Sequence, residues 1–406
     1  MSWPYKYQTG VAYYDSSKAC TGYTLITPFP GRVAPEPNVH LGVTYLMDMQ
    51  GNVVHTWKSP YPTWYARLMP DGHLVATLRC SRPTPDRPGY DKYHMGGASG
   101  MLIELDWEGN LVFEYFDPNM HHDFRKLPNG NYIYLAWEKL PPDLAKKVRG
   151  GQKGTEHKDG TMFGDCLREI DSSARTVWEW HGIEHFDLDI DIIGAIHPRE
   201  EWTHCNNVDV MPNGNILSTS RHTDGAFVID RKSGEIIWRW GNVAYLDPKT
   251  NQVEHHDVRD PKNMGGAHGG HIIAAGLPGE GNMLVYDNGM YNFFSRAVEV
   301  DMKTGEVVWQ SEEAFGIEGY VYGRVHFSPF IAGADRMPNG NTVICSGGNG
   351  VVFEVTPERE VVWHWVRPTP NMESHVRWGI FRAHRYTPDY CPQFANLPQA
   401  GGMGIR

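Results

Sequence analysis

The sequence has no apolar run near the roughly 18 residues that a membrane-spanning helix needs, and its first residues lack the basic and apolar regions of a signal peptide. We therefore predict a cytoplasmic protein with no membrane partner. Basic residues are also few, since 37 Lys and Arg face 48 Asp and Glu, for a formal net charge of −11. Nucleic-acid binding needs a basic face, so nucleic acid is not an expected partner.

Cysteine is scarce, and its spacing is uninformative. The six cysteines are scattered along the chain, with no Cys-x-x-Cys pair or other spacing typical of zinc sites. In a cytoplasmic protein such cysteines are expected to be reduced and buried. The sequence therefore predicts no disulfide framework and no cofactor.

Aromatic residues, glycine and proline are abundant by contrast. The chain contains 14 Trp, 20 Tyr, 44 Gly and 28 Pro among 406 residues. This mixture suits many short strands joined by tight turns better than long helices. An all-β fold is therefore predicted, and large all-β folds often use this length for one domain.

A repeated phrase runs through the chain. A polar turn with glycine is followed by an alternating strand that ends in Trp or Tyr, and the phrase occurs six times, at 48–57, 106–115, 171–180, 230–240, 301–309 and 356–365. A Pro-(Asn/Asp)-Gly-(Asn/His) turn follows most copies, at 70–73, 128–131, 212–215 and 338–341, with an expanded version at 278–282 and a degenerate one near Pro388.

Two hairpins in a unit of roughly 60 residues indicate a four-stranded blade, and radial repetition of such blades forms a β-propeller. We predict a six-bladed β-propeller, or seven blades if one copy is concealed, as a single domain over 1–406. The repeats begin near 45, 101, 166, 226, 296 and 351. Long inter-strand loop insertions interrupt the repeat at 139–164, 181–201, 242–270 and 312–330. Loops on a rigid scaffold are where functional sites usually lie.

The hairpin at 202–224 carries the first chemical signal. Strand alternation predicts that His204 and Asn206 share one face, and Arg221 follows the turn. The innermost strands of a propeller line its channel, so equivalent positions before each turn indicate the channel wall. Counting back from each turn places His122, His204, Asn206 and a histidine near 271 at related positions, and counting forward adds Arg221 and Asn288. The turn at 278–282 has an extra residue, so His268 is an alternative to His271.

The order of these motifs resembles that of the arylsulfotransferase propellers. The resemblance rests on 9–11, on 22–25, on 46–57, on Trp202-Thr-His-Cys-Asn-Asn207, on Ser220-Arg-His222 and on Tyr286-Asp-Asn-Gly289. It covers most of the chain. The family's activity is the transfer of a sulfuryl group from an aryl sulfate to a phenol, so a small aromatic substrate is implied.

The resemblance also implies roles for individual residues. The family's nucleophilic histidine precedes the Asp-Asn-Gly strand and falls on His271. Its sulfate-binding residues fall on His204, Asn206 and Arg221, and a further channel histidine falls on His122 or His121.

These residue types suit the chemistry. A sulfuryl group passes through a transition state with charge on its peripheral oxygens, so the protein mainly positions and neutralises. A neutral imidazole can act as the nucleophile, and His122 is a candidate general acid or base. The aromatic side chains of Trp64, Tyr65 and Trp137 could hold an aryl ring, or could pack between blades.

Two other functions remain open. His122, His204, His271 and His326 could converge on a divalent metal ion and support a lyase, hydrolase or oxygenase. Against a metal, no carboxylate accompanies the histidines at matched positions, and Arg221 would repel a cation. The third reading is a binding propeller without catalysis, whose partners would contact the insertion loops. The sequence does not indicate an oligomeric state.

Overall fold

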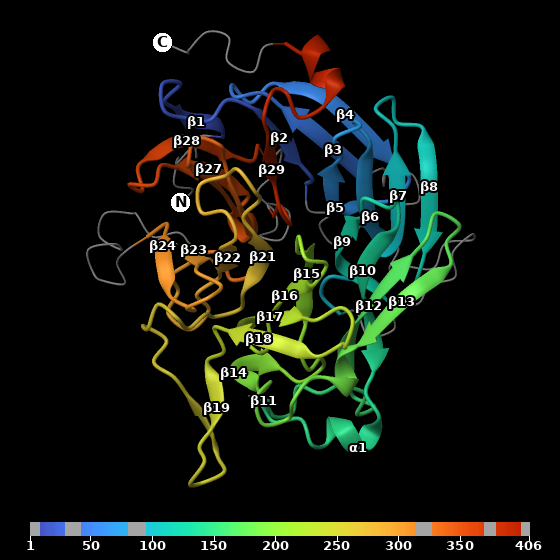
Figure 1. The fold of residues 1–406 in the computed structure, drawn as a ribbon, viewed down its shortest axis with the longest axis vertical. Coiled ribbons are helices and arrows are strands. Elements are labelled where there is room, and N and C mark those ends of the chain that lie inside the picture. The colour runs from blue at the N-terminus through green and yellow to red at the C-terminus, as the bar shows by residue number, and fades with distance from the viewer. Residues whose placement is uncertain (1–8, 29–41, 80–94, 313–326, 369–378, 399–406) are drawn as a thin grey trace, which may run out of the picture.

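The computed structural model describes residues 9–28, 42–79, 95–312, 327–368 and 379–398. Six antiparallel sheets stand around a central axis, which confirms the predicted all-β fold and six-bladed propeller (Figure 1). Five sheets have four strands, and the remaining one has five. None of the helices among the described residues is long and apolar enough to cross a membrane.

The blades follow the chain in order. The sheets, each given from its innermost strand outward, are β29(His384–Tyr386), β2(Tyr23–Ile26), β3(Gly42–Met47), β4(Val53–Ser59); β5(Thr63–Leu68), β6(Leu74–Arg79), β7(Gly100–Leu105), β8(Leu111–Phe116); β9(Met120–Lys126), β10(Tyr132–Lys139), β12(Phe163–Ile170), β13(Thr176–His181); β15(Cys205–Val210), β16(Ile216–Ser220), β17(Gly225–Ile229), β18(Ile236–Trp240); β21(His268–Ile272), β22(Met283–Asp287), β23(Arg296–Val300), β24(Val307–Gln310); and β25(Gly333–Arg336), β26(Thr342–Ser346), β27(Val351–Val355), β28(Val361–Val366), β1(Gly10–Tyr14).

The ring closes by pairing the two ends of the chain. Strand β29 near the C-terminus pairs with β2 near the N-terminus, and β1 adds to the outer edge of the sixth sheet. This pairing explains why the sixth Pro-Asn-Gly turn is degenerate, because no hairpin joins β29 to its partner. It also shifts the blade frame relative to the sequence repeat. A Trp phrase forms the outer hairpin of one blade, and the turn that follows it opens the next blade.

The recurrent tryptophans tie neighbouring blades together. The Nε1–H of Trp57 donates to the carbonyl oxygen of Asp106 at 3.1 Å, and that of Trp180 donates to Gly234 at 2.8 Å. Trp240, Trp309 and Trp363 make the same bond to Gly305, Pro357 and Met49. Each acceptor lies in or beside the outer turn of the next blade. The second copy of the phrase ends in Tyr115, which has no indole N–H to donate.

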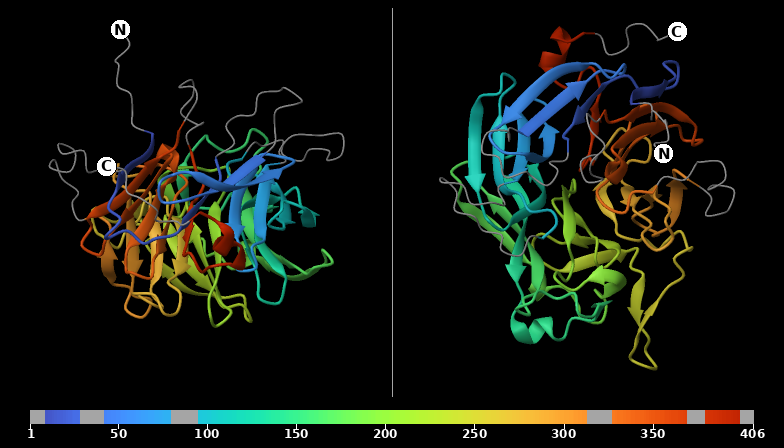
Figure 2. Two further views of the ribbon diagram at one scale, coloured as in Figure 1. Left: turned by 90° about the horizontal axis from the view of Figure 1, so that it is seen from above. Right: turned by 180° about the vertical axis from the view of Figure 1, so that it is seen from behind.

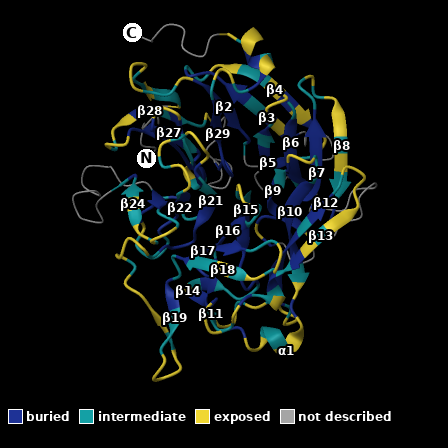
Figure 3. Ribbon diagram, in the orientation of Figure 1, coloured by how far each residue is buried: buried dark blue, intermediate teal, exposed yellow. Residues whose placement is uncertain are grey.

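Apolar clusters fill the spaces between blades and leave the outer strands exposed. Leu25 and Leu46 of the first blade pack with Leu68 and Leu74 of the second, and other adjacent blades share cores in the same way. Figure 3 shows buried strands toward the axis and exposed outer strands such as β8 and β13. The blades therefore hold the inner strands rigidly around the channel.

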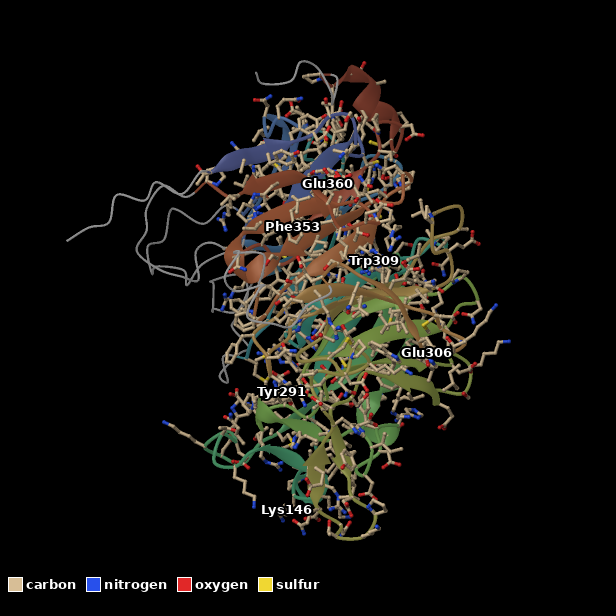
Figure 4. All side chains as sticks on the ribbon, turned by 90° about the vertical axis from the view of Figure 1, so that its left-hand side faces the viewer. Lys146, Tyr291, Glu306, Trp309, Phe353 and Glu360 are labelled. Carbon is tan, nitrogen blue, oxygen red and sulfur yellow. The ribbon has the colours of Figure 1, made fainter. Side chains whose placement is uncertain are left out.

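Three of the four predicted insertions form small elements outside the blades, and much of the fourth lies outside the described residues. The first carries α1(Pro142–Ala145) and β11(Gly150–Gln152), which pairs in parallel with β14(Ile193–Pro198) of the second. The third forms a ribbon of β19(Ala244–Leu246) and β20(Val253–His255), which projects from the ring in both views of Figure 2 that show it edge-on or from behind. Lys146 of the first insertion is exposed and pairs with Asp143 (Figure 4).

Candidate active site

Histidines from three consecutive blades meet near the starts of the inner strands. The ring centroids of His122 and His204 lie 4.7 Å apart, and those of His204 and His222 also lie 4.7 Å apart. We use the name histidine cluster for these residues with their neighbours His121, His197 and His268. All six side chains are buried. The structure thus brings together His121, His122 and His204, as the sequence predicts.

The backbone at this level departs from regular strand geometry. His122 has a φ of 52° and His204 a φ of 51°, both in the left-handed region that non-glycine residues seldom occupy. The pairing of β9 with β10 and of β15 with β16 shifts register beside these residues. Strain of this kind needs support from the surrounding fold and often occurs at functional sites.

The register shift changes the position of Asn206. Its Nδ2–H donates to the carbonyl oxygen of Ala267 at 2.7 Å, and its Oδ1 accepts from the Thr219 hydroxyl at 2.7 Å. Asn206 is fully buried. The simple alternation that placed Asn206 beside His204 is therefore wrong, because an extra residue at the bulge redirects the side chain into the contact between blades.

Carboxylates accompany the cluster, contrary to the expectation from matched positions. Glu201 Oε1 lies 2.8 Å from His204 Nδ1, and Glu201 Oε2 accepts from Trp137 Nε1 at 2.8 Å. Asp165 Oδ1 lies 3.1 Å from His121 Nε2. Asp224 Oδ1 lies 2.8 Å from His197 Nε2. A carboxylate beside one ring nitrogen holds the proton there and fixes the tautomer.

Burial keeps the imidazoles neutral. Burial, with the neighbouring imidazoles and Arg221, holds the pKa values of His122, His204 and His222 well below the usual 6.5. Burial and the charge of Arg221 lower the pKa of His268 to about 3. Neutral imidazoles keep a lone pair, so they can act as nucleophiles or bases at neutral pH.

Arg221 lies beside these neutral imidazoles without an anionic partner. Its Nη1 is 3.5 Å from His222 Nε2, its Nη2 is 3.5 Å from the sulfur of Met290, and its Nε is buried without a hydrogen-bond acceptor. Among the described residues, no carboxylate oxygen lies within 4.0 Å of this guanidinium. A cation with an unused donor in a buried position is suited to bind an oxyanion.

His268, rather than His271, faces the cluster. His268 Nδ1 lies 2.7 Å from Asn288 Oδ1 and 2.9 Å from the Gly266 carbonyl oxygen, while the Ile331 amide approaches Nε2 at 3.3 Å. The placement of His271 with the other channel residues is wrong, because Gly269 and Gly270 form an irregular step in β21. His271 instead lines a cavity with Asp335 and Arg67.

Other predicted residues lie around the cluster. Asn288 contacts His268 and donates to the Ser328 carbonyl oxygen at 2.5 Å. The Trp64 ring lies 6.1 Å from His122, and the His121 ring stacks on Trp137 at 4.5 Å. Trp64 is therefore placed to contact a substrate held beside His122. His326 lies outside the described residues.

Sequence reasoning missed His222, His197, Glu201 and Asp224. Tyr291, which is labelled in Figure 4, donates to Asp224 Oδ2 at 2.6 Å and completes a chain from Tyr291 through Asp224 to His197. His222 was visible beside Arg221 in the motif. Glu201 and Asp224 bound the 202–224 hairpin, but their pairing with histidines depends on loops whose course the repeat does not predict.

The cluster does not form a compact metal site. Among the described residues, three His, Cys, Asp or Glu ligand atoms lie within 4.8 Å of one another only at Asp71, His73 and Glu104, in a turn region of the second blade. Lys126 Nζ already pairs with Glu104 at 2.7 Å there, which opposes a cation. The geometry therefore gives the predicted metal ligands His122, His204 and His271 no common centre.

The turn of the Asp-Asn-Gly motif supplies a stability test. Gly289 has a φ of 60°, and a Cβ there would lie 1.7 Å from the Phe294 carbonyl oxygen. Gly289→Ala is expected to reduce the free energy of unfolding by about 3 kcal/mol, because it adds a backbone clash to left-handed strain. Gly109→Ala is the control, since Gly109 has a φ of 88° and no atom within 4 Å of its Cβ. Urea unfolding should show a loss of only about 1 kcal/mol there.

Glu201 gives a second prediction, for stability against pH. Burial and the nearby charge of Asp165 raise the pKa of Glu201 to about 8, from 4.5. Between these values the folded protein holds a proton that the unfolded chain has lost, so this group makes stability fall as the pH rises from 4.5 to 8. Glu201→Gln mimics the protonated acid. The variant should gain stability relative to the wild type as the pH rises through this window, and a constant difference in melting temperature would contradict the argument.

Comparison with known proteins agrees with the site. The family model described as arylsulfotransferase (ASST) matches residues 32–376. No curated protein matches the sequence significantly. Among solved structures, a protein of unknown function from Bacteroides caccae aligns with 12% identity and a TM-score of 0.49, over 90% of this chain and 98% of that one.

A second solved structure, a catalytically inactive virginiamycin B lyase from Staphylococcus aureus bound to quinupristin, aligns with 9% identity and a TM-score of 0.41, over 84% of this chain and 88% of that one. Likenesses at these TM-scores carry no functional argument. The family match covers most of the chain and supports a sulfotransferase-type enzyme. The chain belongs to the arylsulfotransferase family.

Proposed function

We propose that the protein transfers a sulfuryl group from an aryl sulfate to a phenol at the histidine cluster. The observation that carries the proposal is Arg221, a guanidinium with a buried, unused donor beside neutral imidazoles. The sulfate oxygens of the donor would bind Arg221, and Trp64 would contact the aryl ring beside His122. The site then neutralises charge on the peripheral oxygens as the S–O bond breaks.

His268 is the proposed nucleophile. An Nδ1–H that donates to Asn288 Oδ1 and the Gly266 carbonyl leaves the lone pair on Nε2. In the first half-reaction, Nε2 attacks sulfur, an N–S bond forms, and the bond from sulfur to the aryl oxygen breaks to release phenolate. The Ile331 amide contact at 3.3 Å, longer than the usual hydrogen bond, is released when sulfur approaches.

His122 is the proposed base of the second half-reaction. Asp165 beside His121 Nε2 favours a proton on that nitrogen, so His121 Nδ1 accepts from His122 Nδ1–H at 2.8 Å. This leaves the lone pair of His122 on Nε2. His122 Nε2 removes the proton of the acceptor phenol while the phenol oxygen attacks sulfur and the N–S bond breaks. The proton passes to the phenolate that leaves in the next turnover.

Steady-state and transient kinetics test the proposal. With p-nitrophenyl sulfate as donor and phenol as acceptor, initial rates should give the parallel double-reciprocal lines of a ping-pong mechanism. Without acceptor, one equivalent of p-nitrophenol should be released in a burst. Absence of turnover with aryl sulfates, together with stoichiometric metal in elemental analysis, would contradict the proposal and favour a metal-dependent enzyme.

A further inference from the structure

A second cavity lies one level further along the same inner strands. Each of several strands places a residue near the cluster and another residue three positions later in this cavity, as with Trp64 and Arg67, His122 and Arg125, and His268 and His271. The volume of the cavity is about 330 Å³. No member of the histidine cluster lines it. It is therefore separate from the proposed sulfuryl site.

Five arginines line this cavity, and four of them have carboxylate partners. Arg125 and Arg382 share Asp123, at 2.8 and 2.9 Å. Arg336 pairs with Glu299 at 2.6 Å, and Arg385 pairs with Glu354. These pairs neutralise four of the five charges within the protein.

Arg67 is the exception. Among the described residues, no carboxylate oxygen lies within 4.0 Å of its guanidinium, and its one side-chain hydrogen bond runs from Nη1 to the Tyr65 hydroxyl at 3.0 Å. Tyr65 in turn contacts His384 Nε2 at 2.7 Å, and His384 Nδ1 lies 2.8 Å from Asp335. This chain of contacts holds Arg67 in place and leaves its Nε and Nη2 donors without a side-chain acceptor.

The remaining wall of the cavity is apolar. Ile272, Leu277, Ala334 and the ring of Tyr390 face the same space as Arg67. A pocket of this volume with an apolar wall and one fixed charged group is typical of sites for small organic molecules. A single free guanidinium matches one negative charge, and two parallel N–H donors match the two oxygens of a carboxylate.

We propose that this cavity binds a small organic carboxylate, with the carboxylate on Arg67 and the apolar body against Ile272, Leu277 and Tyr390. The site does not depend on sulfuryl transfer, because it shares no residue with the histidine cluster. It also gives His271 a place at a ligand site, distinct from the role of nucleophile that the sequence suggested.

Titration of the full chain with benzoate, followed by isothermal titration calorimetry, tests the proposal. Benzoate should bind one site per chain, and benzyl alcohol and inorganic phosphate should bind at least tenfold more weakly, since each lacks one of the two features. Arg67→Gln should weaken benzoate binding by about tenfold or more, because a charged hydrogen-bond donor is lost. Equal binding of phosphate and benzoate would overturn the proposal.

Substitutions at Ala274 protect the test from misfolding at Arg67. Ala274 is exposed and lines the cavity, so a new side chain there disturbs no core contact. Ala274→Glu should weaken benzoate binding and Ala274→Lys should strengthen it, each by several-fold through charge alone. Arg175→Gln, at an exposed arginine outside the cavity, is the matched control and should change nothing. Binding that is lost in Arg221→Gln but kept in Arg67→Gln would place benzoate in the histidine cluster and overturn the proposal.

Discussion

His268→Ala is expected to abolish sulfuryl transfer. Without the imidazole, no nitrogen fixed by Asn288 stands beside Arg221 to carry the sulfuryl group, so kcat/KM for p-nitrophenyl sulfate should fall by about 10⁴-fold or more. The burst of p-nitrophenol should disappear. Mass spectrometry of quenched wild-type enzyme should show a peptide that contains His268 with the added mass of one sulfuryl group, and the variant should not.

His271→Ala is the matched control for this experiment. His271 lies three residues away on the same strand and lines the other cavity, so its loss should leave the burst intact and change kcat/KM by less than about threefold. If His271→Ala abolishes the burst and His268→Ala retains it, the assignment from motif order is correct and the one from geometry is not. Circular dichroism of both variants should confirm that each is folded.

Arg221→Gln is expected to lower kcat/KM by about 10³-fold. A guanidinium that neutralises developing charge on peripheral oxygens acts mainly in the transition state, so most of the loss should be in kcat rather than in KM. Glutamine keeps a similar length and can still donate a hydrogen bond, which separates the charge from the side-chain volume. The measurement is the full dependence of rate on donor concentration at saturating phenol.

Two further variants delimit the role of Arg221. Arg221→Lys keeps the charge but loses the planar pair of donors, so its activity should lie between wild type and Arg221→Gln. Arg175→Gln removes an exposed arginine that pairs only with Asp171 and should have wild-type kinetics. An equal loss in kcat/KM for all three variants would indicate a nonspecific effect of charge. A loss in Arg221→Gln confined to KM would indicate ground-state binding alone.

The blade architecture was predictable because it is local and repeated. Each Trp phrase contains its own turn and strand signals, and the indole of Trp57 or Trp180 finds its acceptor in the same phrase of the next copy. Counting phrases therefore counts blades. The offset between repeat and blade was not predictable in the same way, because it is set by the pairing of β29 with β2, which joins the two ends of the chain.

The site was predictable in composition but not in register. His122, His204 and Arg221 are brought together as the repeat suggested, since equivalent strands occupy equivalent places around the axis. Asn206 and His271 fall elsewhere, because bulges add residues where alternation assumes none. A shift of one or more residues moves a side chain to another face or another level of the channel.

The sequence alone determined the all-β class, the number of blades and the enrichment of histidine and arginine on inner strands, because each of these follows from patterns within about 60 residues. Only the tertiary structure decided which imidazole faces Arg221, which carboxylate holds each imidazole, and that a second cavity with Arg67 lies below the first. These depend on left-handed residues such as His122 and His204 and on contacts between blades. Such features come from packing among distant segments, for which a repeat pattern carries no signal.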